Sequence, residues 1–440
     1  MAGVGGGVSR MIKTFYDGLM WVLQPLLRRK LAQRAVREPG YAVAVDERFG
    51  RYTTPNWSGE RPCLWVHAVS LGETRAAAVL IKGWRARWPQ WRILLTHGTA
   101  TGRAEGAALL MEGDAQVWLP WDTTKAAHAF LQHFKPRLGV LMETEVWPNL
   151  VAACRQAGVP LVLANARMNA RSLRRALRIQ SLSRPAYAGL SAVWAQSADD
   201  AQRLRQLGAK VQGVLGNIKF DAQPNAEQLA QGRQWRAASQ RPVIMFASSR
   251  EGEEAEWLAI LKAQAQRADV QWLIVPRHPQ RFEEVAQLIQ AQGLSLSRRS
   301  EWTDQPFDQP LAADVWLGDS LGEMALYYGL SDAALLGGSF APLGGQNLIE
   351  AAACDCPVFM GPHTFNFKEA AQLAQAAGAA QACSSLAAAM LAAEQLVRDA
   401  LGRQAMADAA SDFALAHRGA TGRTLDALAA LLDQQGVDAL

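Results

Sequence analysis

The amino-acid sequence predicts an α/β protein made of two successive parallel β-sheets covered by helices. From about residue 62 onward, short apolar runs alternate with helical patterns, as expected for β/α units. A polar, Gln- and Ala-rich stretch with prolines at 222–242 interrupts this alternation, which then restarts. At 440 residues the chain is too long for one ordinary core, so two domains of roughly 200 residues each are expected.

The apolar runs place the strands. In the first series we expect strands at 62–69, 92–96, 116–119, 138–142, 160–164, 192–195 and 211–215. In the second series we expect them at 243–247, 271–275, 314–317, 332–336 and 356–360. The predicted organisation is an N-terminal segment at 1–38, domains at 39–222 and 243–415, a linker at 223–242 and a C-terminal helix at 416–440. Because ligands bind outside the carboxyl ends of such strands, the two domains are expected to face each other across a cleft.

The N-terminal segment is predicted to contact a membrane. Its apolar residues follow the spacing of one helical face: Ile12, Phe15, Leu19, Val22 and Leu26. Asp17 interrupts the segment, which is short for a bilayer span of ~20 residues. A basic cluster follows and favours anionic lipid on the cytoplasmic side: Arg28, Arg29, Lys30, Arg34 and Arg37. An interfacial anchor, a marginal span, and an amphipathic helix packed on the body are the three alternatives.

Charge and cysteine usage narrow the class of protein. The formal net charge is +5, which suits an anionic ligand or membrane surface but is too weak to indicate nucleic acid. Five scattered cysteines form no disulfide framework, which favours a reducing cytosolic setting. His128 and His133 are five residues apart and lie on different helix faces, so no zinc site is predicted there.

The stretch WVHAVSLGETRAA (65–77) is a strand-to-helix turn with a lone carboxylate, Glu73, beside a glycine. Ser70 and Glu73 have the spacing of a capping box, in which each side chain satisfies a free backbone N–H. The turn by itself favours this capping role over a catalytic one. Glu73 nevertheless follows a strand, and ligands bind at the edge of the sheet where strands end, so Glu73 is also a candidate functional residue.

Further polar groups of the first half also follow strands. LMETEVWPNL (141–150) ends a strand in Glu143 and Glu145. On an extended segment these two acids point the same way and repel each other unless a cation or donor lies between them. ANARMNARS (164–172) places Asn165 at a strand end, and LGNIKFD (215–221) supplies Lys219, which could meet a bound anion. Solvated charges at strand ends are the alternative.

The second half contains a glycine-rich loop, ALLGGSFAPLGGQNLIEAA (334–352). A strand ends at the first glycine pair, and a helix begins near Asn347. Glycines permit close backbone approach, and a helix N-terminus supplies N–H groups and a positive dipole for a phosphate. Glu350 lies one turn into the helix, where a carboxylate can accept hydrogen bonds from ribose hydroxyls. A flexible turn with an exposed Glu350 is the alternative.

Two more loops are candidates for the same ligand. LIVPRHPQRF (273–282) ends a strand in Arg277 and His278, each flanked by a proline, and Arg is suited to a phosphate fork. LGDSLGEMALYY (317–328) is another strand-to-helix turn, with Gly322 and Glu323. No Asp-x-Asp motif is present to hold a metal against a diphosphate. If a nucleotide sugar is used, helix termini and Lys or Arg must therefore stabilise the leaving phosphate.

Together these motifs resemble the 3-deoxy-D-manno-octulosonic acid (Kdo) transferases of lipopolysaccharide assembly. The match runs in order through ERFGRY, HAVSLGE, LPWD, METEVWPNL, ANARMNARS, GNIKFD, SREGEE, VPRHPQRF, GDSLGEMALYYG, GGSFAPLGGQNLIEAAACDCPV and GPHTFNFKEAA, over some 320 residues. The resemblance implies the GT-B fold, with two Rossmann-like domains and an N-terminal anchor helix at 12–27. It also implies transfer of Kdo from CMP-Kdo to lipid IVA with inversion, at the cytoplasmic face of the inner membrane, without a metal or other cofactor.

The resemblance also assigns residues. Glu73 would be the general base that takes the proton from the acceptor hydroxyl, and Glu143 and Lys219 would support the transition state. The CMP-binding positions would be Pro276, Arg277, Leu321, Gly322, Glu323, Asn347, Leu348, Ile349 and Glu350. The sequence departs from the family pattern at Gln346, where His is frequent, and at His97, where a hydroxyl residue is usual.

Two other classes of function remain as alternatives. Another GT-B enzyme, either a different glycosyltransferase or a UDP-sugar epimerase, would have the same fold, although an epimerase needs no membrane anchor. A nucleotide-sugar binding protein that has lost catalysis is the non-enzyme alternative. The presence of both Glu73 and Lys219 argues against it.

Overall fold

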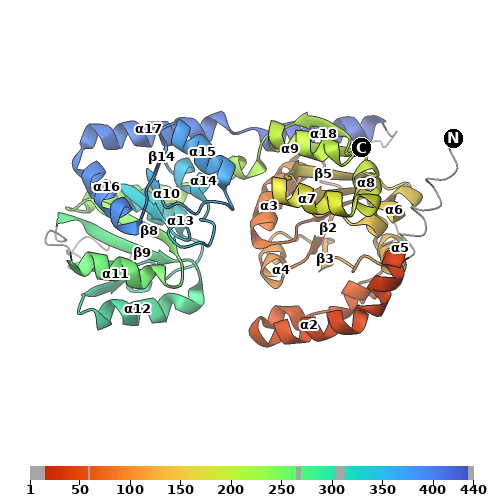
Figure 1. Cartoon of the computed structure of the whole chain (residues 1–440), viewed down its shortest axis with the longest axis horizontal. Coiled ribbons are helices and arrows are strands. Elements are labelled where there is room, and N and C mark those ends of the chain that lie inside the picture. Colours follow the sequence, from red (N-terminus) through yellow and green to blue (C-terminus); the bar gives the residue numbers. More distant parts are fainter. Residues whose placement is uncertain (1–14, 58–59, 264–268, 303–312, 435–440) are drawn as a thin grey trace. The chain divides into compact units, whose positions relative to one another are not determined.

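The computed structural model describes residues 15–57, 60–263, 269–302 and 313–434 (Figure 1). The chain forms two compact units. The first contains residues up to Asp221 together with those from Arg418 onward, and the second contains Ala222–His417. The segment at 223–242, expected as a linker, belongs to the second unit, where its helix α10 (Ala226–Ala238) packs against α13 (Met324–Leu330).

The first unit contains a seven-stranded parallel sheet. Its strands are β1 (Cys63–His67), β2 (Arg92–His97), β3 (Ala115–Trp118), β4 (Leu138–Met142), β5 (Leu161–Ala166), β6 (Ala192–Ala195) and β7 (Val211–Val214). Their order is β3-β2-β1-β4-β5-β6-β7, with every pair parallel. The order reverses between β1 and β4, and such a switch point is where open α/β sheets place their ligands.

Helices cover both faces of this sheet. They are α3 (Leu71–Arg87), α4 (Ala100–Ala107), α5 (Thr124–Phe134), α6 (Pro148–Gln156), α7 (Ala170–Arg178), α8 (Gln180–Ala188), α9 (Ala198–Gln206) and α18 (Ala420–Gln434). Side chains of β1 alternate between two cores because its residues have a period of two. Trp65 packs edge-on to Phe130 of α5 in one core, while Leu64 joins Trp84 of α3 and Leu428 of α18 in the other.

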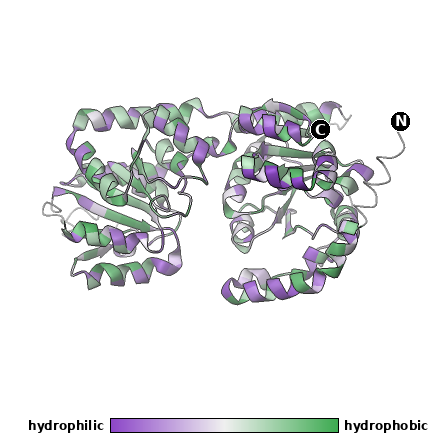
Figure 2. Cartoon of the chain, viewed as in Figure 1, coloured by the Kyte–Doolittle hydropathy of each residue, from purple (hydrophilic) through white to green (hydrophobic). Residues whose placement is uncertain are grey.

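The second unit repeats this plan. Its strands are β8 (Val243–Ser249), β9 (Gln271–Pro276), β10 (Leu296–Arg298), β11 (Val315–Leu317), β12 (Ala333–Leu336), β13 (Val358–Met360) and β14 (Ala380–Ala382). They are parallel in the order β10-β11-β9-β8-β12-β13-β14, so the switch point lies between β8 and β12. The remaining helices are α11 (Glu253–Ala263), α12 (Phe282–Ala291), α14 (Leu348–Ala353), α15 (Lys368–Ala376), α16 (Leu386–Arg398) and α17 (Ala400–Ala416). Figure 2 shows mostly apolar strands, while the helices around them alternate apolar and hydrophilic residues.

All twelve predicted strands are present, and two short strands, β10 and β14, were not predicted. The sheet prediction was therefore correct in class and incomplete at the edges of the second sheet. The chain returns to the first unit at Arg418, where α18 packs on α3 so closely that a Cβ on Gly83 would lie 2.6 Å from Leu425 Cδ1. The Asp221 carboxylate accepts the N–H groups of Gly419 and Thr421, both at 2.5 Å, which joins the two places where the chain changes unit.

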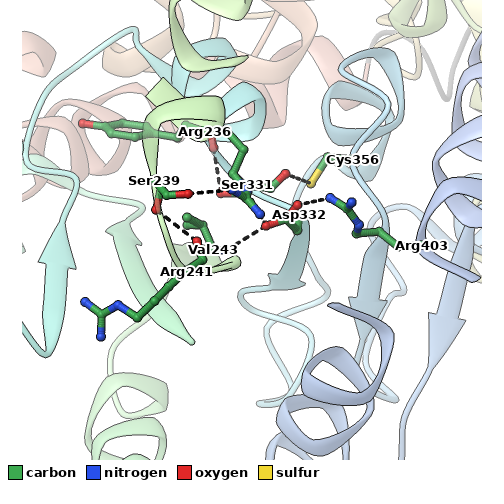
Figure 3. Close-up of polar contacts among 9 residues, drawn as sticks. Arg236, Ser239, Arg241, Val243, Ser331, Asp332, Cys356 and Arg403 are labelled. Atoms are coloured by element: carbon green, nitrogen blue, oxygen red, sulfur yellow. Dashed lines mark hydrogen bonds and ion pairs between the residues drawn. The ribbon is translucent and has the colours of Figure 1, made fainter. Parts of the chain in front are cut away.

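A buried ion-pair cluster lies at the amino ends of β8 and β12 (Figure 3). Asp332 accepts the Val243 N–H at 2.8 Å and the Arg236 Nε–H at 2.5 Å, and it also pairs with Arg403 of α17. Asp332 thereby ties α10 and α17 to the sheet. The cluster is at the edge opposite to the carboxyl ends of the strands, so its role is structural.

The described part of the N-terminal segment is helical at 15–22 and again in α2 (Gln24–Arg37); residues 12–14 of the expected anchor lie outside the described residues. Asp17 accepts hydrogen bonds from Thr124 N at 2.7 Å and Asn149 Nδ2 at 3.2 Å, and the Tyr16 hydroxyl bonds to Asp122. These bonds fix the segment to the starts of α5 and α6. Among the described helices, none combines the length and the apolar character needed to cross a membrane.

Candidate active site

Glu73 lies in the first turn of α3, directly after β1. Ser70 caps the helix, and its hydroxyl is 3.5 Å from the Glu73 N. Oε2 of Glu73 accepts the Val69 N–H at 2.6 Å, whereas Oε1 is 3.5 Å from Ser70 Oγ. The capping role predicted from the sequence is therefore present. Because only one of the two carboxylate oxygens makes a short bond, the other can still accept a proton.

His67 ends β1, directly before this turn, and a second buried histidine, His97, supports the turn. The Gln116 amide lies 2.9 Å from His97 Nε2, so Nδ1 carries the proton and donates to the Ala68 carbonyl at 3.0 Å. Burial lowers the pKa of His97 to about 4 and that of His67 to about 3, so both rings are neutral near pH 7. His97 thus holds the backbone from which Glu73 receives its hydrogen bond.

Glu143 and Lys219 form a close ion pair. Lys219 Nζ lies 2.6 Å from Glu143 Oε1, and both side chains are largely buried. The expectation that Glu143 and Glu145 lie on an extended segment is wrong, because Glu143 has a φ of 60° in a turn. A cation was expected beside these acids, and Lys219 is that cation for Glu143.

Asn165, at the end of β5, positions Lys219. Its Oδ1 accepts the Ile218 N–H at 3.0 Å, and its carbonyl accepts the Gln196 side chain at 2.9 Å. Asn165 is buried and has a φ of 51°, a left-handed conformation that Asn tolerates better than most residues. The loop after β7 is thereby held so that Lys219 reaches Glu143.

The electrostatic surroundings make Glu73 a weak acid. Burial, followed by the charges of Glu143 and Glu145, raises the pKa of Glu73 to about 7. The Val69 N–H and Lys219 act in the opposite direction. A carboxylate with a pKa near 7 is well matched to general base catalysis at neutral pH. Glu73 and Glu143 follow β1 and β4, the two strands on either side of the switch point.

In the second unit, Glu253 organises the glycine-rich loop. This buried carboxylate, in the first turn of α11, accepts the N–H of Gly338 at 2.7 Å and those of Phe340 and Ala341 at 3.2 Å. It also accepts the Arg250 N–H at 3.0 Å. Sequence reasoning missed this residue, because its partners in the loop lie 85 to 88 positions away.

The first glycine pair of the loop permits a close approach between β8 and β12. A Cβ on Gly337 would lie 2.2 Å from the Ser248 carbonyl oxygen, so only glycine fits. Gly337, which follows β12, is therefore in direct contact with the end of β8 at the second switch point. This arrangement places Arg250 and the glycine-rich loop at one edge of the sheet.

A group of cations lies at the same edge. Burial and the charges of Arg250, Arg277 and Arg281 lower the pKa of His278. The charge of Arg281 is offset by its ion pairs with Glu254 and Glu284. Gln346 Oε1 accepts the Arg277 Nε–H at 3.3 Å and so orients Arg277. A set of positive groups beside strand ends is suited to an anionic ligand.

The remaining predicted ligand residues lie at the carboxyl ends of β9, β11 and β12. Pro276 ends β9, and Leu321, Gly322 and Glu323 follow β11. Glu323 pairs with Arg299 at 2.9 Å, and Leu321 is 72% exposed. The first turn of α14 carries the rest, Asn347 to Glu350.

At the start of α14, a ligand can meet backbone groups and the side chains of Asn347 and Glu350. Asn347 caps the helix by accepting the Ile349 N–H at 3.2 Å. The side chains of Leu348 and Ile349 are in the core, so these two residues can meet a ligand only through their backbone. Glu350 is partly exposed in the first turn.

Comparison with known proteins identifies close relatives. Residues 44–222 match the family model described as 3-Deoxy-D-manno-octulosonic-acid transferase (kdotransferase). The chain is 48% identical over 416 residues to a 3-deoxy-D-manno-octulosonic acid transferase of Bordetella pertussis, covering 92% of this chain and 96% of that protein. A transferase of the same name from Haemophilus influenzae is 33% identical over 435 residues, covering 96% of this chain and 100% of that one.

Solved structures of similar fold include an epimerase and a glycosyltransferase. A UDP-GlcNAc 2-epimerase of Neisseria meningitidis, bound to UDP-GlcNAc, matches with a TM-score of 0.55 and 16% identity, over 83% of this chain and 99% of that one. A glycosyltransferase of Rickettsia africae matches with a TM-score of 0.55 and 13% identity, over 85% of this chain and 99% of that one. These likenesses show an α/β fold of the GT-B kind and nothing finer.

Proposed function

We propose that the donor is CMP-Kdo and that the acceptor is lipid IVA. The premise is that the chain belongs to the 3-deoxy-D-manno-octulosonic acid transferase family and is thus an enzyme that transfers Kdo. The observation that carries the proposed chemistry is the environment of Glu73. Its carboxylate has one loosely held oxygen, a pKa of about 7, and a position beside the switch point of the first sheet.

The proposed reaction is a single displacement with inversion. Glu73 takes the proton of an acceptor hydroxyl as the hydroxyl oxygen attacks the anomeric carbon of Kdo. The bond from that carbon to the CMP phosphate breaks on the opposite face, and CMP leaves with the electron pair. Lys219 holds the neighbouring Glu143 in place and offsets the negative charge around the base.

We assign CMP binding to the second unit. Arg277 and Arg250 supply positive charge for the phosphate, together with backbone N–H groups at the start of α14. Glu350 is proposed to accept hydrogen bonds from the ribose hydroxyls. Leu321, Gly322 and Glu323 border the same edge of the sheet from the loop after β11. In this proposal cationic side chains stabilise the leaving phosphate, and no metal is required.

We further propose that the enzyme lies on the cytoplasmic face of the inner membrane and does not span it. Phe15, Trp21 and Val22 are exposed on the N-terminal helix, which suits insertion at the interface. Asp17, in the same helix, is bonded to the starts of α5 and α6. These bonds favour a segment that stays docked on the protein while its apolar side chains enter the headgroup region.

The test is a transfer assay with CMP-Kdo and tetraacylated lipid A precursor, in the presence of a chelator, comparing the wild type with Glu73→Gln. The glutamine can keep the hydrogen bond from Val69 but cannot take a proton. Glu256→Gln, an exposed change on α11, is the matched control. Transfer by the wild type and control, with near loss in the folded Glu73→Gln enzyme, is expected.

The other outcomes are equally informative. A fully active Glu73→Gln enzyme would return Glu73 to its capping role and make Glu143 the candidate base. Absence of transfer by a folded wild type would overturn the proposed substrates. Activity that appears only without the chelator would overturn the metal-independent mechanism.

A further inference from the structure

One segment of the protein, besides the basic cluster at 28–37, carries a marked excess of positive charge. Residues 146–198 contain seven arginines, no lysine and no acidic residue. The whole chain has 45 basic and 40 acidic residues, so the other 387 positions carry 38 basic and 40 acidic residues, a net charge of −2. This segment therefore accounts for the entire net positive charge.

Five of these arginines are exposed on α7 and α8, and we call them the arginine surface: Arg171, Arg174, Arg175, Arg178 and Arg184. None of them makes an ion pair or side-chain hydrogen bond with another described residue. Elsewhere in the described chain, exposed and half-buried arginines such as Arg75, Arg85 and Arg298 are paired with carboxylates. Other exposed arginines, such as Arg137 and Arg205, also have no ion pair with a described residue, but the arginine surface gathers five such side chains on two successive helices in a segment without acidic residues.

The arrangement on α7 is one-sided. Four arginines at spacings of three and four share one helical face, while Leu173 and Leu177 pack into the core on the other. Like charges at these spacings destabilise a helix, and no acidic neighbour along the helix relieves the repulsion. An anionic surface would supply the missing negative charge.

The surroundings indicate which anionic surface fits. Ile179, between α7 and α8, is 56% exposed among the arginines. Helix α8 packs on α6, and the first turn of α6 holds the N-terminal helix through Asn149 and Asp17. Helix α8, which carries Arg184, and the N-terminal helix therefore both contact α6. Basic residues beside exposed apolar ones are typical of proteins that lie on anionic bilayers.

We propose that the arginine surface on α7 and α8 is a second, electrostatic membrane contact that binds the phosphate headgroups of anionic phospholipids. This inference rests on the proposed location at the membrane but not on the proposed donor or acceptor. The apolar N-terminal helix would enter the headgroup region, while the arginines would hold the first unit against the anionic surface through charge.

The test measures binding of the full-length protein to vesicles, without any transfer reaction. Vesicles of phosphatidylcholine alone are compared with vesicles that also contain phosphatidylglycerol, at low and high salt. The test variant is Arg174→Gln/Arg175→Gln/Arg178→Gln. The control variant is Lys82→Gln/Arg137→Gln/Lys210→Gln. It removes three exposed charges, which lie on α3, before β4 and before β7, respectively.

We expect the wild type to prefer anionic vesicles, with the preference lost at high salt. The test variant should lose about 100-fold in partition to anionic vesicles, roughly 1 kcal/mol for each charge removed, and should keep its weaker binding to neutral vesicles. The control should lose at most a few-fold. Circular dichroism and the Tm of both variants should match the wild type, since the changed side chains are exposed.

Two results would overturn the proposal. One is equal loss of vesicle binding in the test and control variants, which would indicate a general charge effect. The other is unchanged vesicle binding with a raised KM for the lipid acceptor in neutral detergent micelles, which would assign the arginines to the phosphates of the acceptor. If the wild type transfers no Kdo but the vesicle results hold, the proposed substrates fail and the membrane contact stands.

Discussion

Lys219 Nζ lies 2.6 Å from Oε1 of Glu143, and the backbone of Glu143 is held in the left-handed region at a φ of 60°. A non-glycine residue in this region carries backbone strain, which persists only where its surroundings hold it. Here the Glu143 N–H donates to the Ala164 carbonyl at 3.1 Å, and the Glu143 carbonyl accepts the Arg167 N–H at 3.0 Å. The ion pair is therefore built into the junction of β4 and β5, beside Glu73.

Replacing Lys219 should change the pH dependence of the enzyme. Lys219 lowers the pKa of Glu73, so Lys219→Met should raise it and move the acid limb of the kcat/KM profile to higher pH. At pH 7 we expect a loss of about 10- to 100-fold, part of which is recovered at higher pH. Lys210→Met, at an exposed site in the same unit, serves as the control. An acid limb at the wild-type pH would show that Lys219 does not act through Glu73.

The wild-type pH profile is itself a prediction. A general base is active when deprotonated, so kcat/KM should rise about tenfold per pH unit below about pH 7 and level off above it. Glu73→Gln should lose 10²- to 10⁴-fold in rate, the usual contribution of a general base, and show no such limb. A limb that persists in Glu73→Gln would belong to another group, with Glu145 the first candidate because burial raises its pKa.

Glu73 should also lower stability at neutral pH. Its pKa is raised from 4.5 to about 7 on folding, so the folded state binds the proton more tightly and stability falls as pH rises between those values. Glu73→Gln does not titrate. The difference in Tm between Glu73→Gln and the wild type should therefore grow in favour of the variant as pH rises across this window. Above pH 7 the free energy of unfolding of the variant should exceed that of the wild type by about 1–2 kcal/mol. Parallel Tm curves for the two proteins would contradict the raised pKa.

Glu253→Gln should weaken both donor binding and folding. An amide offers one accepting oxygen to the four N–H groups that the buried carboxylate now satisfies. We expect a destabilisation of about 2–3 kcal/mol and a KM for CMP-Kdo raised about tenfold. Glu256→Gln, exposed on the same helix, should alter neither. The measurements are thermal unfolding and the KM values for both substrates. The KM for the acceptor should not change, and a raised acceptor KM would contradict a role of Glu253 confined to donor binding.

Asp332→Asn should affect stability alone. The change removes ion pairs with Arg236 and Arg403 at a carboxylate that is 5% exposed. We expect a loss of about 2–4 kcal/mol, since breaking a buried pair leaves charge without its partner. KM values should stay at wild-type levels at a temperature where the variant is folded, because the cluster lies at the amino ends of the strands. Altered KM values with unchanged denaturant midpoints would reverse this assignment.

Apart from the partly exposed edge strand β7, the predicted strands consist of residues that are nearly all buried, which produces continuous apolar runs. Strands β10 and β14 have three residues each and are partly exposed at sheet edges, so no such run marks them. Glu73 was recognisable as a candidate from its position after a strand, although its turn alone favours a capping role. The geometry of Glu143 was not, because its positive φ is fixed by contacts with residues far along the chain. Glu253 escaped prediction for the same reason, since local spacing carries no signal of its partners in the glycine-rich loop.

The return of the chain to the first unit has a consequence for biosynthesis. The second unit is one continuous stretch, Ala222–His417, and has all its residues once that stretch has left the ribosome. The first unit lacks α18 until the residues after His417 have been made, and until then the apolar face of α3 around Gly83 is without Leu425 and Leu428. The half of the protein that is made first is therefore completed last. During that interval its uncovered apolar surface is open to chaperones or to aggregation.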